Sequence, residues 1–291
     1  MTTLSQKLII LKTVVTAIVL TSLTFSGRST ALADERLPDG EIAVATINGS
    51  KISAWYGSPT TRYRHGILGD AVEAGSLHVQ IGDGEILSFH LPETEVFEDR
   101  TPRLADLNGD GAIEIITIRS YLNAGGSVAV FGIRDGRLTE LAGSRPIGRA
   151  NRWLNIAGIA DFTGSGTLQI AYVETPHIGG TLTFLEWRSN ELVPVASMPG
   201  FSNHKIGSRE QGLTGSLDYT GNGYLDLVVP SDDLRTLRIV GFEDGTLIEF
   251  NREKLSAKVL KNLNSADGDQ KCVTFELTNG QTVEICPITG R

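Results

Sequence analysis

From about residue 41 onward the chain alternates short apolar segments with glycine-containing turns. Similar stretches recur at residues 75–87, 126–138, 180–192 and 235–247, and each continues as an apolar strand pattern. The first three open on glycine followed by serine or threonine, and the fourth opens on Arg235-Thr236. Asp-Gly stands at the centre of three of them, and Asp-Gly between alternating apolar residues is typical of a β-hairpin. No long segment carries apolar residues at helical spacing, so the pattern predicts an all-β chain.

The pattern also repeats on a larger scale. Residues 104–118, 159–173 and 216–229 align with one another, and their first aspartates, Asp106, Asp161 and Asp218, are 55 and 57 residues apart. Residues 63–91 form a shortened copy without the acidic loop. A unit of this length holds about four short strands and has the size of one propeller blade.

Stacking such units around an axis buries the faces that one four-stranded sheet leaves exposed. The repeats therefore predict a β-propeller of about five blades, with six or seven as the alternative, each a four-stranded antiparallel sheet. We expect residues 34–291 to form a single domain, whose ring closes where residues 41–45 and 51–55 meet the C-terminal hairpin.

The C-terminal hairpin has a register that its side chains determine. A three-residue loop with Gly280 in the left-handed conformation places Phe275 opposite Val283, Val273 opposite Ile285, and Cys272 opposite Cys286. That register separates apolar from polar side chains, whereas a two-residue loop mixes them. Two cysteines facing each other in an exported chain predict a disulfide, with a pair of free thiols as the alternative.

The first 33 residues have the features of a secretory signal peptide: a basic start, an apolar run from Leu8 to Leu23 and the small-residue pattern Ala31-Leu32-Ala33. An uncleaved membrane anchor is the alternative, although the run is short for a bilayer span. Cleavage predicts a periplasmic or secreted protein without a membrane span. It also changes the net charge from −8 to −11, which argues against nucleic-acid binding by general charge neutralisation.

The loop from Asp106 to Glu114 supplies hard oxygen ligands. Asp106, Asn108, Asp110 and Glu114 stand at positions one, three, five and nine, and the carbonyl of Ala112 stands at position seven. Calcium prefers several such oxygens on a flexible loop with a glycine, so the loop predicts a structural calcium site.

The other two copies have fewer carboxylates. Asp218, Thr220, Asn222 and Asp226 offer two and predict a second possible calcium site, whereas Asp161, Thr163, Ser165 and Gln169 offer one. Hydrogen bonds from hydroxyl and amide groups could hold such turns without metal, and we favour this alternative for the Asp161 loop.

These loops, each followed by a β-rich strand, resemble the FG-GAP and VCBS repeats of integrin-α-like propellers over about residues 63–250. The chain is also similar to exported bacterial proteins of this repeat type whose activity is not known. The resemblance implies a propeller in which calcium stiffens the loops between strands and takes no part in catalysis.

Basic and aromatic residues recur just before the first strand of each expected blade, in the segments 61–65, 98–103, 149–155 and 202–210. In a propeller such segments converge beside the central channel. We therefore expect a ligand-binding face for carboxylate, phosphate or sulfate oxygens, with aromatic rings available for stacking. Its candidate residues are Arg62, Arg64, His65, Arg100, Arg152, Trp153, His204 and Arg209.

The alternative is that Glu98, Asp99 and Glu210 pair with these arginines and only tie neighbouring blades together. No hydrolase elbow, zinc-protease motif or phosphate-binding glycine loop is present. We therefore expect a non-enzymatic interaction module of the cell envelope, whose partner is an envelope protein, an anionic small molecule or a glycan. The alternative function is a propeller hydrolase or lyase acting on an acidic polysaccharide or phosphoester.

Overall fold

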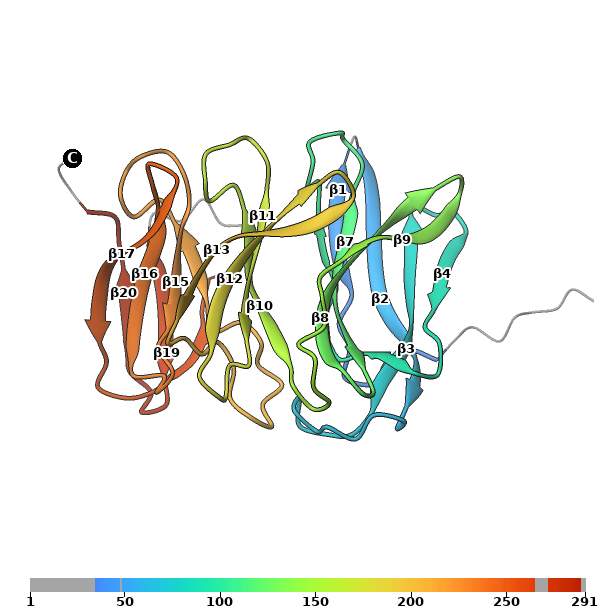
Figure 1. Ribbon diagram of the computed structural model, residues 1–291, viewed down its shortest axis with the longest axis horizontal. Coiled ribbons are helices and arrows are strands. Elements are labelled where there is room, and N and C mark those ends of the chain that lie inside the picture. The colour runs from blue at the N-terminus through green and yellow to red at the C-terminus, as the bar shows by residue number, and fades with distance from the viewer. Residues whose placement is uncertain (1–34, 48, 265–271, 289–291) are drawn as a thin grey trace, which may run out of the picture. The chain divides into compact units, whose positions relative to one another are not determined.

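A computed structural model describes residues 35–47, 49–264 and 272–288 of the chain (Figure 1). All regular structure in these ranges is β-strand, and they contain no helix, so the all-β prediction is confirmed. The predicted signal peptide, residues 1–33, lies outside the described residues.

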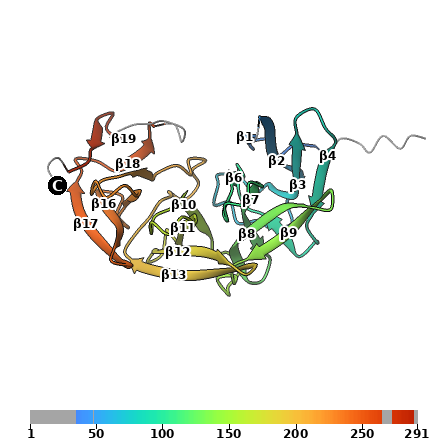
Figure 2. The same cartoon turned by 90° about the horizontal axis from the view of Figure 1, so that it is seen from above.

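The N-terminal half forms a nine-stranded sheet in the described part of the chain. Strand β5 joins two groups of four antiparallel strands, β1–β4 and β6–β9, because Phe97 pairs with Arg119 of one group and Ala74 of the other. The strands of the two groups can be followed in Figure 2. The strands are β1 (Ala43–Ile47), β2 (Ser50–Thr60), β3 (Glu73–Ile81), β4 (Ile86–His90), β5 (Glu95–Phe97), β6 (Arg103–Ala105), β7 (Glu114–Tyr121), β8 (Gly125–Arg134) and β9 (Arg137–Gly143).

Two further four-stranded sheets repeat the order of β6–β9 in the described residues. Their strands are β10 (Leu154–Ala160), β11 (Gln169–Glu174), β12 (Thr181–Arg188) and β13 (Glu191–Pro199), then β14 (Gly215–Leu217), β15 (Asp226–Pro230), β16 (Thr236–Glu243) and β17 (Thr246–Lys254). In all three units the acidic loop connects the first and second strands. The predicted turns at Asp135-Gly136 and Asp244-Gly245 adopt positive φ at both residues, as a tight hairpin requires.

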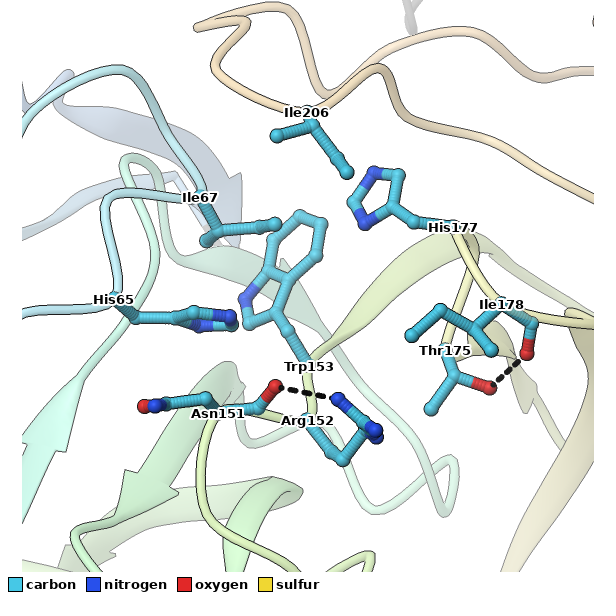
Figure 3. A pocket seen from close by; sticks show the side chains of 9 residues that line it. All are labelled: His65, Ile67, Asn151, Arg152, Trp153, Thr175, His177, Ile178 and Ile206. Atoms are coloured by element: carbon cyan, nitrogen blue, oxygen red, sulfur yellow. Dashed lines mark hydrogen bonds between the residues drawn. The ribbon is translucent and has the colours of Figure 1, made fainter.

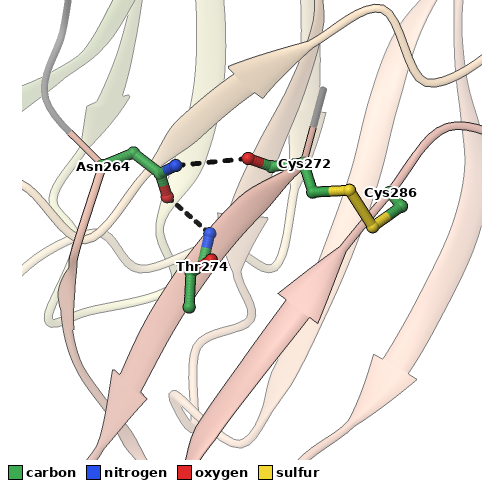
Figure 4. The surroundings of a disulfide bond; sticks show 4 residues. All are labelled: Asn264, Cys272, Thr274 and Cys286. Carbon is green, nitrogen blue, oxygen red and sulfur yellow. Dashed lines mark hydrogen bonds between the residues drawn. A yellow bond between two sulfur atoms is a disulfide. The ribbon is translucent and has the colours of Figure 1, made fainter. Parts of the chain in front are cut away.

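The last sheet in the described ranges contains β18 (Val259–Asn262), β19 (Val273–Leu277) and β20 (Thr282–Ile285). Phe275 pairs with Val283 and Val273 with Ile285, so the predicted register is confirmed. The Cys272–Cys286 disulfide is present with an S–S distance of 2.05 Å, and Asn264 Nδ2 donates to the carbonyl of Cys272 beside it (Figure 4).

Apolar side chains connect each sheet to the next along the chain. Ile116 and Val128 share a core with Ile156 and Leu185 of the following sheet. The rings of Phe184 and Phe242 lie 5.2 Å apart across the next interface, and Leu237 and Phe275 belong to one cluster across the last. These contacts bury faces that single sheets would expose to water.

The expected first strand, residues 41–45, begins two residues later as β1, and residues 51–55 belong to β2, which pairs with β1. Closure of the sheets into a ring, and the number of blades, stay predictions.

Candidate functional site

The Asp106 loop is held by its first carboxylate. Asp106 Oδ1 accepts the backbone N–H of Gly109 at 2.8 Å, and Oδ2 accepts that of Gly111 at 2.9 Å. Asp110 Oδ1 accepts the N–H of Ala112 at 2.7 Å, which helps to hold the pKa of Asp110 below its usual value. Asp106 and Asp110, two of the predicted calcium ligands, therefore fix the backbone conformation of the loop through hydrogen bonds.

Glu114, the ninth residue of the loop, is fully buried, with 0% of its surface exposed. Its Oε2 accepts the N–H of Leu107 at 3.0 Å, but its Oε1 has no hydrogen-bond partner. Among the described residues, the nearest cationic atom to Oε1 is Nη2 of Arg134, at 4.0 Å. Burial raises the pKa of Glu114 to about 7. A buried carboxylate oxygen without a partner is costly, and a bound cation would satisfy it, so this donor set fits calcium.

The Asp161 loop satisfies the same position with an amide. Gln169 Oε1 accepts the N–H of Phe162 at 2.8 Å, while its Nε2 donates to the carbonyl of Thr167 at 2.9 Å and to Ser165 Oγ at 3.3 Å. Residues 165 and 167 are positions five and seven, where the Asp106 loop offers oxygens to a metal. The amide of Gln169 donates hydrogen bonds to these two oxygens. This agrees with the alternative that hydrogen bonds, and not a metal, hold the Asp161 loop.

The Asp218 loop is intermediate between the other two. Asp226 Oδ2 accepts hydrogen bonds from the backbone N–H groups of Tyr219 and Thr220, each at 3.0 Å, and from the Thr220 hydroxyl at 3.2 Å. Asp218 accepts the N–H groups of Asn222 and Gly223. The loop keeps two carboxylates, but three donors already engage one oxygen of Asp226.

One other group of possible metal ligands stands out in the described residues. Ligand atoms of Cys272, Glu284 and Cys286 all lie within 4.8 Å of one another. The two sulfurs form the disulfide, so no thiolate is available to bind a metal there.

The arginine-bearing segments do meet. His65 Nδ1 hydrogen-bonds Glu98 Oε1 at 2.6 Å, and Trp153 Nε1 donates to the Glu98 carbonyl at 2.9 Å. The ring of His204 lies 4.7 Å from that of Trp153. We call the surface built by residue 39 and residues 61–72, 98–102, 144–153, 175–180 and 200–214 the arginine face.

The position of the first segment differs from the expectation. Residues 61–65 do not precede the first strand of a unit but lie between β2 and β3. In an antiparallel sheet, the turn between the second and third strands lies at the same end as the segment that enters the first strand. The segment therefore still reaches the arginine face.

Three of the candidate arginines are paired. Arg62 donates to the carbonyl of Glu95 and pairs with Glu93 at 3.3 Å. Arg100 donates to the carbonyl of Asp39 at 3.0 Å and to that of Arg209 at 2.6 Å. Arg209 pairs with Asp39 at 3.0 Å and Asp70 at 2.8 Å, and we call Asp39, Asp70, Arg100 and Arg209 the Asp39 cluster.

These contacts tie segments distant in sequence, although through partners other than the predicted Glu98, Asp99 and Glu210. Arg100 and Arg209 also line a larger pocket of about 580 Å³, beside β6 and β10. Its polar wall includes Gln211, whose Nε2 donates to Asp99 Oδ1 at 3.1 Å.

Arg152 lies in a different environment. Its Nη1 donates to the carbonyl of Asn151 at 3.3 Å, and no carboxylate in the described residues lies within 4.0 Å of its guanidinium. It lines a pocket of about 120 Å³, the Trp153 pocket (Figure 3). The lining is His65, Ile67, Asn151, Arg152, Trp153, Thr175, His177, Ile178 and Ile206. Arg64 is exposed and lies outside this lining.

His65 and Glu98 form an acid–histidine pair at the wall of the Trp153 pocket. The Glu98 carboxyl is fully buried and also accepts a hydrogen bond from the Ser120 hydroxyl. Burial raises the pKa of Glu98, and the bond to His65 opposes that rise. The pair can orient the His65 ring and move a proton along their shared hydrogen bond.

His177 was not among the candidate residues. Its Nε2 lies 3.0 Å from Nδ1 of His204, whose own Nε2 hydrogen-bonds the carbonyl of Ser208 at 2.9 Å. Burial lowers the pKa of both imidazoles to about 4, so both are neutral at pH 7. The turn between β11 and β12 carries His177, and its place at the same end of the sheet as Arg152 is the signal that could have identified it.

Comparison of the chain with known protein families and with curated proteins returns no match. Nowhere in the described ranges does a helix run long and apolar enough to cross a bilayer.

Proposed function

We propose that the chain is an exported, FG-GAP-like β-propeller of five blades that acts as a non-enzymatic binding module, with calcium stiffening the Asp106 loop and an anionic ligand bound on the arginine face. Five consecutive strand groups support the fold: β1–β4, β6–β9, β10–β13, β14–β17 and β18–β20. The repeated place of the acidic loop between first and second strands supports the family resemblance. The basic and apolar start of the chain supports export.

The observation that carries the proposed binding role is the contrast among the arginines. Arg152 has no carboxylate partner in the described residues and lines the Trp153 pocket, whereas Arg62, Arg100 and Arg209 are paired. A guanidinium at the wall of a pocket can donate two parallel hydrogen bonds to a carboxylate or to another oxyanion. The indole of Trp153 and the apolar lining provide contact surface for the remainder of the ligand.

Thermal unfolding with anionic probes tests the binding role. We expect at least one of four probes, namely acetate, inorganic phosphate, galacturonate and benzoate, to raise the melting temperature of the wild-type chain, because a ligand that binds only the folded form stabilises it. The variant Arg152→Gln should lose this response. The matched control Arg149→Gln, an exposed arginine outside the lining, should keep it. A response that survives Arg152→Gln would reject the pocket as the site.

Calcium binding is tested by the same thermal unfolding experiment, run with calcium and with a chelator. At a hundred times its Kd, calcium should stabilise the wild type by about 2.7 kcal/mol. Glu114→Gln should lose this shift, because the introduced amide can donate to the Ala112 carbonyl as Gln169 donates to that of Thr167. Asp161→Asn is the control and should keep the shift. A full calcium response in Glu114→Gln would exclude the Asp106 loop as the site.

The alternative function, a hydrolase or lyase, rests on one observation. His65, oriented by Glu98, lines the same pocket as Arg152 and could act as a general base beside a bound anion. Release of phosphate from a phosphomonoester, or of unsaturated uronate from polygalacturonate, would favour this function if His65→Gln abolished it. We expect no turnover from the wild type.

A further inference from the structure

We propose that the Trp153 pocket selects a small monocarboxylate with a compact apolar body, its carboxylate on Arg152 and its body among Ile67, Trp153, Ile178 and Ile206. This inference rests on the proposed binding role and names its ligand class. The four loops that supply these residues are separate in sequence and surround one cavity (Figure 3).

The charges in the pocket favour a single negative charge. Arg152 is the one arginine or lysine among the described lining residues. His65 shares its hydrogen bond with the buried carboxyl of Glu98, which offsets any positive charge on the ring. His177 is neutral at pH 7 because burial lowers its pKa to about 4. A dianion such as phosphate would bury a second charge without a partner, which is costly.

The apolar part of the lining is large and partly open. Ile206 and Ile178 are among the most exposed large hydrophobic side chains of the described residues, at 64% and 60%, and both flank the pocket. Ile67 and Trp153 are buried and form its inner wall. An apolar body seated between them would remove both exposed isoleucines from water, which favours binding.

The size and hydrogen-bonding groups of the pocket limit the ligand further. Its volume of about 120 Å³ is close to that of a cavity of ~150 Å³ known to hold benzene. Thr175 Oγ1 already donates to the carbonyl of Ile178 at 3.1 Å. A sugar acid would bring several hydroxyls into a lining with few groups to bond them, so a branched aliphatic or aromatic acid fits better.

Calorimetric titration of the purified chain with acetate, 3-methylbutanoate, benzoate, benzamide, galacturonate and inorganic phosphate tests this inference. Each buried methylene strengthens binding by about fourfold, so 3-methylbutanoate and benzoate should bind at least about tenfold more tightly than acetate. Benzamide should bind at least about tenfold more weakly than benzoate, because it lacks the charge that Arg152 recognises.

Two variants locate the two halves of the ligand. Arg152→Gln should weaken benzoate binding at least about tenfold, and Ile206→Ser should weaken it about threefold or more while leaving acetate unchanged. The matched controls Arg149→Gln and Ile86→Ser, which alter an exposed arginine and an exposed isoleucine outside the lining, should bind benzoate as the wild type does.

Failure of the inference differs from failure of the proposed function. If phosphate or galacturonate binds more tightly than benzoate, and Arg152→Gln abolishes that binding, the ligand class is wrong but the anion-binding role stands. If no probe binds the wild type, or if every affinity survives Arg152→Gln, both are wrong.

Discussion

The arginine face contains two groups of arginines, one paired with carboxylates and one without a carboxylate partner in the described residues. In the Asp39 cluster, Arg209 pairs with the carboxylates of Asp39 and Asp70. Arg100 donates to the backbone carbonyls of Asp39 and Arg209 and also lies near the Asp39 carboxylate. In the Trp153 pocket, the guanidinium of Arg152 has only the carbonyl of Asn151 as a hydrogen-bond partner in the described residues. Neighbouring carboxylates therefore distinguish a structural arginine from one available to a ligand.

The titratable groups near the two parts of the arginine face also differ, because their pKa values shift in opposite directions. Glu73 is 2% exposed and is affected by the charges of Glu98, Asp70 and Asp39, and burial together with these charges raises its pKa to about 9. At the Trp153 pocket, burial instead lowers the pKa of His177, which lines it, and of His204, which contacts His177, to about 4. Both environments disfavour the charged form of the side chain. Glu73 therefore destabilises the fold as the pH rises, whereas the two histidines destabilise it as the pH falls.

Glu73→Gln should give the largest effect. The folded-state pKa is raised, so the contribution of the protonated carboxyl is fully present below pH 4.5 and is lost as the pH rises through about 9. The neutral amide avoids that loss, which amounts to about 1.4 kcal/mol for each pH unit between the two pKa values. The variant should therefore equal the wild type in stability at pH 4.5 and exceed it by several kcal/mol at pH 9. Urea unfolding at both pH values measures this, with exposed Glu85→Gln as the control. Equal stability at pH 9 would contradict the assignment.

His204→Gln tests the opposite sign at the Trp153 pocket. The folded-state pKa of His204 is lowered, so the unfolded chain binds more protons between pH 6.5 and about 4, and acid destabilises the wild type there. The variant loses ring packing at every pH. Its deficit relative to the wild type should nevertheless shrink by about 2 kcal/mol between pH 7 and pH 4. A deficit that stays constant in urea unfolding would show that this imidazole is not held neutral.

Asp39→Ala should destabilise the chain by about 1–2 kcal/mol, because Arg209 loses one of its carboxylate partners and Arg100 loses a nearby one. The backbone carbonyl of Asp39 still accepts from Arg100, so the loss is partial. Thermal unfolding measures it against Asp83→Ala, an exposed hairpin aspartate. Benzoate affinity should not change, and its loss would mean that the two parts of the face act together.

Arg152→Gln should have the smallest effect on stability, within about 0.5 kcal/mol of the wild type, because the side chain has no carboxylate partner in the described residues. Thermal unfolding without ligand measures it. A loss comparable with that of Asp39→Ala would place Arg152 among the structural arginines and remove the contrast between the two parts.

The pattern of apolar and polar residues and the turn residues made the C-terminal hairpin predictable. Alternation and a Gly280 turn determined which residues of the C-terminal hairpin face each other, so the amino-acid sequence alone was enough to pair Cys272 with Cys286. The nine-stranded sheet was not predictable, because β5 joins two strand groups through a contact between Phe97 and Ala74, which are distant in sequence.

The candidate site was predictable only in outline. The repeat indicated that the arginine-bearing segments would meet, but the partners of each arginine depend on side-chain positions in space. Asp39 lies outside the repeated segments, and Asp70 lies in the shortened copy at a position that no motif marks. Their carboxylates pair with Arg209, whereas Arg152 has no such partner in the described residues. His177 lies in a turn without any motif, and only the direction of β11 brings it to the pocket.

The indole N–H resonances of the three tryptophans provide the most direct test of the pocket as the binding site. Trp153 lines the pocket and donates its indole N–H to the Glu98 carbonyl, whereas Trp55 and Trp187 lie on β2 and β12, outside the lining. In a titration with benzoate followed by NMR, the Trp153 signal, assigned by its loss in Trp153→Phe, should shift while the other two stay in place. A stable Trp153 signal during saturable binding, or shifts only at Trp55 or Trp187, would contradict the assignment of the ligand site to this pocket.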